Sequence, residues 1–301
     1  MMSREHIVVG LGELLWDLFP AGKQLGGAPA NFAYITALLG DVGIPASRVG
    51  DDALGSEALG RLVELGLSTE LVQQDRDHPT GTVNVVLNNG QHHFEIRENV
   101  AWDFLEWTDS WQNLACQADA VCFGSLAQRS SKSRATILSF LRATRAEAVR
   151  VFDVNLRQNF YSEKILERSM ELATIVKLNH EELPKIMHLL ERTMSAEPEA
   201  ARVLLSLYKL KLVCVTRGNG GSLLVSAAEC TEHPGFKVNV ADTVGAGDAF
   251  TAALVHGYLR GVSLAEMNEN ANRVGAWVAS QSGAMPSPKQ EGLQQTLMEI
   301  V

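Results

Sequence analysis

The sequence predicts an α/β protein with a mainly parallel central sheet flanked by helices. Short apolar segments typical of buried strands alternate along the chain with longer segments that have helical spacing. Repeated strand–helix units favour parallel pairing, because each helix returns the chain to the side of the sheet where the next strand begins. The 301 residues are 46% hydrophobic, which is enough for one large core. We therefore expect helices on both faces of the sheet.

The individual elements follow from apolar spacing and from residues that end helices. At residues 28–39, Ala30, Ala33, Tyr34 and Ala37 recur at helical intervals, and Gly40 ends the pattern. The same reasoning predicts helices at residues 56–65, 132–145, 162–173, 246–259 and 265–280. The predicted strands lie at residues 7–12, 120–124, 150–155, 175–179, 212–216 and 222–226. The polar segment 191–199 is expected to be a surface loop or a frayed helix end.

One region departs from the alternation of strands and helices. Residues 81–87 and 91–97 are strand-like, and Asn89-Gly90 between them is a strong hairpin signal. Residues 16–19 form a further short strand-like segment. We expect a small β-sheet outside the main one, although an antiparallel edge on the main sheet fits the same pattern.

Composition and charge exclude several classes of protein. A formal net charge of -9 and a pI of about 5.4 give no general attraction for polyanions, so nucleic acid is a poor partner. No apolar run reaches the length of about 18 residues that a membrane span needs, and no signal-peptide pattern is visible. None of the four cysteines belongs to a Cys-x-x-Cys pair, which favours reduced thiols. We expect a soluble, cytoplasmic protein without a membrane partner.

The most informative segment is 242–250, Asp-Thr-Val-Gly-Ala-Gly-Asp-Ala-Phe, where a predicted helix begins. Small residues at Gly245, Ala246 and Gly247 let backbone N–H groups crowd around an anion, and a helix start adds unpaired donors and the positive end of its dipole. Asp248 would stand beside the anion, where a carboxylate can take the proton of an attacking hydroxyl. A lone Gly-x-Gly before an acidic residue is otherwise an ordinary helix start. The segment is neither a Walker A loop nor a dinucleotide fingerprint.

This segment resembles the C-terminal signature of the ribokinase-like carbohydrate kinases, also called the phosphofructokinase-B family. The resemblance implies a ribokinase-like fold, with Gly245, Ala246 and Gly247 as an anion hole for the transferred phosphate and Asp248 as the catalytic base. Motifs follow in order from Asp17 to Asn272, so residues 1–301 are expected to form a single kinase domain. Segments of about 13–25 and 80–103 are expected to form a β lid over the sugar. Such a lid would keep water from competing with the sugar hydroxyl.

Further motifs imply the sugar site. Gly26-Gly27-Ala28-Pro29-Ala30-Asn31 resembles the family's N-terminal signature, and Asp17 stands where the family commonly has a sugar-binding acid. Asp153-Val154-Asn155-Leu156-Arg157 resembles a strand-end motif, and strand alternation would place its three polar residues on one side. Its arginine would hold a sugar oxygen or a phosphate oxygen, which the sequence does not separate. The expected substrate-binding residues are Asp17, Gly26, Gly27, Asn31, Arg97 and Arg157.

The nucleotide and ion sites also rest on the resemblance. Residues 216–221 match a Thr-x-Gly-x-x-Gly turn that, with a residue of the last helix, would line the nucleotide. The expected nucleotide-binding residues are Thr216, Gly218, Gly221 and Asn272. Asn179 and Glu182 match an Asn-x-x-Glu pattern and are expected to hold the Mg²⁺ of the Mg-nucleotide through water. Asp242 and Thr243, with Gly283 and Ser287, would surround a monovalent cation such as K⁺ as in some relatives, and this stays open.

Within the family, the run Gly-Glu-x-x-x-Asp-x-x-Pro before Gly-Gly-Ala-Pro-Ala-Asn looks most like the fructokinases, as do Arg97, Asn99 and Trp102-Asp103. The resemblance implies a kinase that transfers the γ-phosphoryl group of ATP to fructose. Kinases of 2-keto-3-deoxygluconate, ribose or nucleosides stay open, as does a non-catalytic sensor of sugar or nucleotide on the same scaffold. A dehydrogenase is disfavoured because no complete Gly-x-Gly-x-x-Gly follows the first strand. A homodimer that pairs two lid sheets is a further hypothesis.

Overall fold

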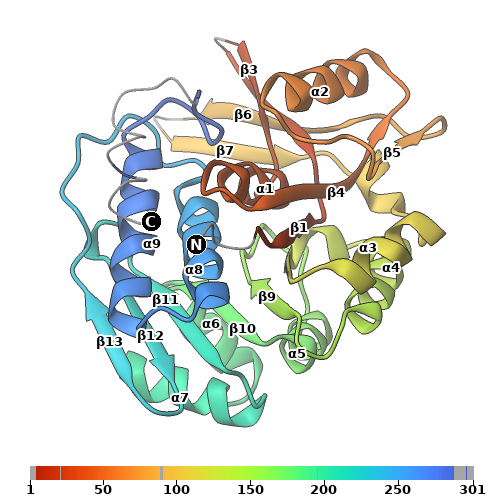
Figure 1. Ribbon diagram of the computed structural model, residues 1–301. Helices are drawn as coiled ribbons and strands as arrows, with labels where there is room; N and C mark the ends of the chain where they lie inside the picture. The colour runs from red at the N-terminus through yellow and green to blue at the C-terminus, as the bar shows by residue number, and fades with distance from the viewer. Residues whose placement is uncertain (1–4, 21, 89–90, 195, 288–295, 297–301) are drawn as a thin grey trace.

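The computed structural model describes residues 5–20, 22–88, 91–194, 196–287 and 296. Within them the chain forms a large nine-stranded sheet in the order β13-β12-β11-β10-β9-β8-β1-β4-β5 (Figure 1). Pairing is parallel from β11 to β5, whereas β12 and β13 add an antiparallel edge. The strands are β1 (Ile7–Leu11), β4 (Val42–Gly50), β5 (Val72–Asp75), β8 (Ala120–Gly124), β9 (Val149–Asp153), β10 (Ile175–Asn179), β11 (Leu212–Thr216), β12 (Ser222–Ser226) and β13 (Cys230–His233).

Two layers of helices cover the sheet, as expected for strand–helix repeats (Figure 1). One layer holds α1 (Ala28–Leu38), α2 (Ala53–Glu64), α8 (Ala246–Arg260) and α9 (Leu264–Ala279). The other holds α3 (Asp109–Gln117), α4 (Ser131–Ala143), α5 (Glu163–Leu172), α6 (Glu182–Leu189) and α7 (Glu197–Leu207). Short 3₁₀ turns are η1 (Ala101–Phe104), η2 (Leu126–Gln128) and η3 (Gly218–Gly220). Among the described residues, no helix combines the length and the apolar character that crossing a bilayer requires.

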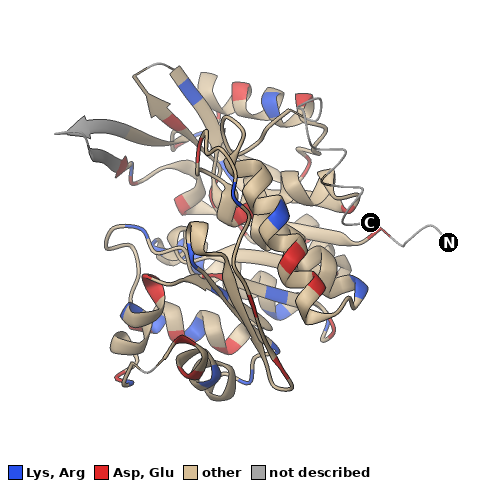
Figure 2. Ribbon diagram, turned by 90° about the vertical axis from the view of Figure 1, so that its left-hand side faces the viewer, with Lys and Arg blue, Asp and Glu red and all other residues tan. Residues whose placement is uncertain are grey.

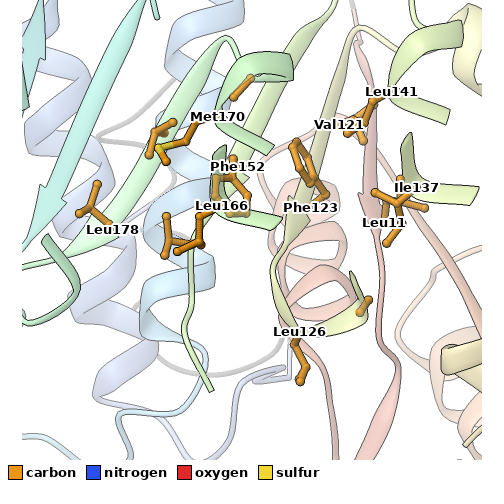
Figure 3. Close-up of a cluster of buried hydrophobic side chains, with 14 of the residues drawn as sticks. Leu11, Val121, Phe123, Leu126, Ile137, Leu141, Phe152, Leu166, Met170 and Leu178 are labelled. Carbon is orange, nitrogen blue, oxygen red and sulfur yellow. The ribbon is translucent and has the colours of Figure 1, made fainter. Parts of the chain in front are cut away.

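Alternation along the strands divides the core into two apolar layers. Phe123, Phe152 and Leu178 point toward the α3–α7 layer, where they pack with Leu166 and Met170 (Figure 3). The Phe123 and Phe152 rings stack with centroids 5.3 Å apart. The intervening strand residues point toward the α1, α2, α8 and α9 layer. Both faces of the central strands are therefore buried, as is usual in parallel sheets.

The small second sheet is confirmed and lies apart from the large one. Its order is β3-β2-β6-β7, and it projects from one end of the molecule (Figure 2). Its strands are β2 (Leu15–Phe19), β3 (Gly22–Gly26), β6 (Gly81–Asn88) and β7 (Gln91–Ile96). The alternative of a hairpin on the edge of the large sheet is wrong, because β6 pairs with β2. The predicted turn Asn89-Gly90 lies outside the described residues.

Most predicted elements are confirmed within a few residues, and one local expectation is wrong. The strand predicted at residues 150–155 ends at Asp153, and Asn155 has a φ of 42° in the left-handed region. Asp153, Asn155 and Arg157 therefore do not share one side of an extended strand. The surface loop expected at residues 191–199 is confirmed for the described residues up to 196, and α7 begins at Glu197 with Pro198 in its first turn. The strand β4 was missed by the apolar spacing, since it contains Gly43 and Pro45.

Candidate functional site

The candidate site lies where the carboxyl ends of the parallel strands meet the N-terminus of α8. The helix α1, which follows β1, packs on one face of the sheet, and α4, which follows β8, packs on the other. The chain leaving β1 crosses one face of the sheet to β4, and the chain leaving β8 crosses the other face to β9. A crevice forms between β1 and β8, where these two connections diverge. Residues after β1, β9 and β10 surround this crevice.

The first turn of α8 contains the residues predicted to bind an anion. Gly245 is the N-cap and has a φ of 77°, a conformation that favours glycine. A Cβ at this position would lie 2.4 Å from the Cβ of Ala284, so a side chain has no room. The first intrahelical bond runs from the amide of Ala249 to Gly245, and the amide of Ala246 bonds at 3.3 Å to the carbonyl of Thr243. The amides of Gly247 and Asp248 remain at the helix start, where a phosphate can be bound.

Asp248 lies beside these amides and accepts a hydrogen bond from Asn31. The Nδ2 of Asn31 donates to Oδ2 of Asp248 at 2.8 Å, across 217 positions of sequence. Burial raises the pKa of Asp248 to about 6, and the charge of Asp153 adds to the rise, while the Asn31 bond opposes it. The carbonyl oxygen of the Asn31 amide is buried without a hydrogen-bond partner in the described part of the chain. The carboxylate is thus held in place, with a basicity suited to taking a proton near neutral pH.

Two more acids face the same space, and the arginine of the strand-end motif lies close to both. The pKa of Asp17 is raised to about 6, mainly by burial. The charge of Arg157 opposes this rise, whereas the charges of Asp242 and Asp248 add to it. Burial raises the pKa of Glu13 to about 7, and Asp248 contributes to that rise. One carboxylate oxygen of Glu13 is buried without a hydrogen-bond partner in the described part of the chain. Carboxylates paired with an exposed arginine can bind adjacent hydroxyl groups of a polyol.

The two glycines of the N-terminal signature make room for these acids. A Cβ on Gly26 would lie 2.7 Å from Oδ2 of Asp17, on the neighbouring strand β2. A Cβ on Gly27 would lie 2.4 Å from the carbonyl oxygen of Glu13, and this residue has a φ of 108°. Both substitutions would push the strand β3 and the start of α1 away from the acids. Arg97 is exposed at the end of β7, and its carbonyl accepts from Nη2 of Arg129 at 2.6 Å.

Beneath the first turn of α8 lies a buried ion pair that the sequence did not suggest as part of the site. The ammonium of Lys177 is 3.1 Å from both carboxylate oxygens of Asp153, its direct neighbour across β9 and β10. The hydroxyl of Thr251 donates to Asp153 at 3.0 Å. Burial opposes the charge of Lys177, but Asp153, Glu182 and Asp248 together raise its pKa above the ordinary value. The ammonium of Lys177 therefore stays charged inside the protein.

The expected nucleotide residues line the carboxyl edge of β11 and the neighbouring α9. Thr216 ends β11, and Gly218 and Gly221 bound the turn that follows, with φ values of 58° and 79°. A Cβ on Gly221 would lie 1.9 Å from the carbonyl of His233, whereas one on Gly218 would meet nothing within 4 Å. The Nδ2 of Asn272 donates to the hydroxyl of Ser222 at 2.7 Å, so the strand β12 holds the side-chain amide of Asn272 in place. Ser222 pairs with Thr216 in the sheet, so Asn272 lies beside the same turn.

The expected magnesium residues cap α6. Oδ1 of Asn179 accepts the amide of Glu182 at 2.8 Å, and Oε2 of Glu182 accepts the amide of Asn179 at 2.8 Å. Oε1 of Glu182 accepts the amide of Leu156 at 2.8 Å. Each carboxylate oxygen keeps a free lone pair for water, which is compatible with an ion held indirectly. Among the described residues, no group of three or more His, Cys, Asp or Glu is arranged to bind a metal directly.

The expected monovalent-cation residues come together at the end of α9. The carboxylate of Asp242 accepts the amides of Val244 at 3.0 Å and of Gly283 at 3.3 Å. Thr243 is exposed next to it, and its carbonyl accepts from Ala246. This contact ties the segment directly to the first turn of α8.

The sequence motifs assigned no role to two buried charged residues that lie beside the expected site residues. Glu13 belongs to the run Gly-Glu-x-x-x-Asp but received no role from it, and Lys177 lies outside the motifs. Both are buried charged residues within apolar segments, at 3% and 8% exposed. A lysine in the middle of the strand Ile-Val-Lys-Leu-Asn was the available signal, because buried lysines are rare without a partner.

Comparisons with known proteins extend along nearly the whole chain. The family model described as "pfkB family carbohydrate kinase" matches residues 12–291. A fructokinase of Escherichia coli is 31% identical over 299 residues, covering 91% of this chain and 94% of that protein. The structure of a sugar kinase of Pyrococcus horikoshii in complex with ATP superposes with a TM-score of 0.84 at 29% identity, covering 98% of this chain and 100% of that one.

The structure of a fructokinase double mutant of Vibrio cholerae, in a form with bound fructose, ADP and potassium ion, superposes with a TM-score of 0.80 at 25% identity. The match covers 97% of this chain and 98% of that one.

Proposed function

This chain belongs to the pfkB family of carbohydrate kinases, and we propose that it phosphorylates fructose with ATP. The observation that carries the proposal is the pairing of Asp248 with Asn31 beside the free amides at the start of α8. A base and an anion site side by side are what phosphoryl transfer to an alcohol requires. The fructokinases among the relatives support fructose as the acceptor.

In the proposed reaction, the sugar hydroxyl gives its proton to the carboxylate of Asp248 while its oxygen attacks the γ-phosphorus of ATP. The bond from this phosphorus to the bridging oxygen breaks, and ADP leaves with that electron pair. The amides of Gly247 and Asp248, with those of Gly245 and Ala246 as the loop adjusts, would hold the oxygens of the phosphoryl group. Because the amides of Gly247 and Asp248 are fixed at the helix start before the reaction, they stabilise developing charge without reorganisation.

The sugar would lie between the small sheet and α8. Asp17 would accept hydrogen bonds from two neighbouring hydroxyls, and Asn31 would orient both Asp248 and the sugar. Gly26 and Gly27 permit the close approach, while Arg97 and Arg157 would contact the outer oxygens of the sugar or the phosphate. The small sheet would act as a lid that excludes water, which otherwise competes as the acceptor.

ATP would run along Thr216, Gly218, Gly221 and Asn272. When bound, Mg²⁺ neutralises charge on the phosphates, and Asn179 and Glu182 would hold it through water. Asp242 and Thr243 would contribute to a K⁺ site, which the potassium ion in the Vibrio cholerae fructokinase structure supports. A cation there would steady the loop that carries Gly245.

An assay that couples ADP release to a visible signal tests the proposal with a panel of acceptors. The panel contains fructose, 2-keto-3-deoxygluconate, ribose and a nucleoside. We expect kcat/KM for fructose to exceed the others by at least about tenfold, because hydroxyl-binding sites discriminate strongly. A higher value for another acceptor would replace fructose while keeping the kinase. Nucleotide binding without ADP release on any acceptor would favour a sensor.

The association state and the location of the protein stay predictions. The homodimer through the small sheet predicts a mass near twice that of the 32.7 kDa chain in light scattering. A monomeric mass would remove this hypothesis. The cytoplasm, which supplies ATP, remains the expected compartment.

A further inference from the structure

The face of the sheet beneath α8 is apolar except for one ion pair. Lys177 and Asp153 are 8% and 4% exposed, and their neighbours on the adjoining strands are Cys214 for Lys177 and Gly124 for Asp153. Burying two charges costs free energy that their mutual attraction only partly returns, so a pair of this kind contributes little to stability. A function at the nearby site is therefore the better reason for its presence.

The pair contacts the catalytic turn from below. A Cβ added to Gly247 would lie 3.1 Å from the ammonium nitrogen of Lys177, so the lysine approaches the turn at a residue that lacks a side chain. Thr251 links Asp153 to the same turn, because its hydroxyl lies 3.0 Å from Asp153 and 2.9 Å from the carbonyl of Gly247. Asp153, Thr251 and Asp248 border one small cavity of about 10 Å³, which is about the space for a single water.

We propose that Lys177 is a positioning residue for phosphoryl transfer, which places a buried positive charge under Gly247 and against the Asp248 carboxylate. Asp153 holds the ammonium at this point, and Thr251 holds Asp153. This role rests on the proposed function and assigns to it a residue that lies outside the recognised motifs. The positive charge of Lys177 would attract the negatively charged phosphoryl group, which approaches the opposite side of the first turn of α8.

The charges around the turn make a cation necessary there. Asp248 and Asp153 carry two negative charges, and the incoming phosphoryl group adds more. Lys177 is the buried cation that faces both acids, while Arg157 is exposed and screened by solvent. The titratable groups that face the pair from the surrounding elements are Glu13, Cys122, Arg157, Glu182, Cys214 and Asp248.

The test separates charge from shape by removing both charges together. The double variant Lys177→Met with Asp153→Asn keeps the side-chain volumes and leaves no unpaired buried charge, so it is expected to fold where Lys177→Met alone could fail. We expect kcat to fall at least about tenfold at pH 8, with the KM for sugar nearly unchanged, because the lost charge acts on the transferred group. Thr251→Val removes a bond to Asp153 but keeps both charges, so its kcat should fall less than that of the double variant.

The single variant Asp153→Asn adds a readout that a structural role would not move. Without the repulsion from Asp153, Asp248 ionises more readily, so the acidic limb of the kcat/KM profile shifts to lower pH. The same shift appears in a ¹³C NMR titration of the Asp248 carboxyl group, which needs no sugar. A folded double variant with the kcat of wild type would overturn the proposal. An acidic limb of the kcat/KM profile that stays at the same pH in Asp153→Asn would overturn it as well. A wild-type protein inactive on every acceptor would count against the proposed function, and the NMR titration would still decide this inference.

Discussion

The glycine that begins α8 offers a sharp test of how the anion site is built. Gly245 and Gly261 cap the two ends of the same helix, and both have left-handed backbones, with φ values of 77° and 67°. A Cβ on Gly261 would meet nothing within 4 Å, whereas one on Gly245 would lie 2.4 Å from the Cβ and 2.7 Å from the Cα of Ala284. Alanine at either end therefore carries the same backbone strain, and only one position adds a steric clash.

The expected magnitudes differ accordingly. Gly261→Ala should lower the free energy of unfolding by about 1–2 kcal/mol, which is the cost of the left-handed conformation. Gly245→Ala should cost about 1–3 kcal/mol more, because the backbone of Ala284 must move. Urea unfolding at pH 7 measures both values, provided that the slopes of the transitions agree.

Turnover distinguishes the two variants further. A displaced Gly245 moves the amides of Gly247 and Asp248, so kcat should fall about tenfold or more in Gly245→Ala. Gly261→Ala should leave kcat unchanged, since it lies at the far end of the helix. Equal losses of stability in the two variants, or full activity in Gly245→Ala, would refute the argument from packing against Ala284.

Two further predictions concern the buried acids. Burial raises the pKa of Asp248 to about 6, and the base must be ionised to take a proton. We therefore expect kcat/KM to fall as the pH drops through about 6. A profile of kcat/KM that stays flat down to pH 4.5 would contradict this. Burial raises the pKa of Glu13 from 4.5 to about 7, so this residue costs the fold stability as pH rises above 4.5, reaching about 3 kcal/mol once pH passes 7. The variant Glu13→Gln should therefore have a higher free energy of unfolding at pH 8, by up to about 3 kcal/mol. This gain in stability should vanish below pH 4.5. Urea unfolding at both pH values measures the difference.

The fold was largely readable from the sequence because its strands are short apolar segments bounded by polar residues. The segments 120–124, 175–179, 212–216 and 222–226 were predicted with the bounds that the structure has. The strands β3 and β4 were not predicted individually. The sequence of β3, Gly-Lys-Gln-Leu-Gly, is polar, and β4 includes Gly43 and Pro45. Their strand conformation depends on pairing with distant segments, which local propensity does not record.

The site was readable only in part, for a similar reason. The resemblance assigned a role to each of Asn31 and Asp248, but their mutual hydrogen bond depends on how α1 packs against α8. Asn155 was misplaced because the chain turns left-handed after β9, which no pattern in the motif indicates. Lys177 and Glu13 became visible only through burial and neighbouring charge, both of which are properties of the folded chain.

The central claim is that Asp248 takes the proton of the sugar hydroxyl, and Asp248→Asn tests it most directly. The amide nearly preserves the shape and can still pair with Asn31 after a flip, but it cannot accept the proton at neutral pH. Steady-state kinetics should show kcat reduced by about 10²–10⁴-fold, while calorimetry shows an ATP affinity within about threefold of wild type. A variant that retains the kcat of the wild type would contradict the account.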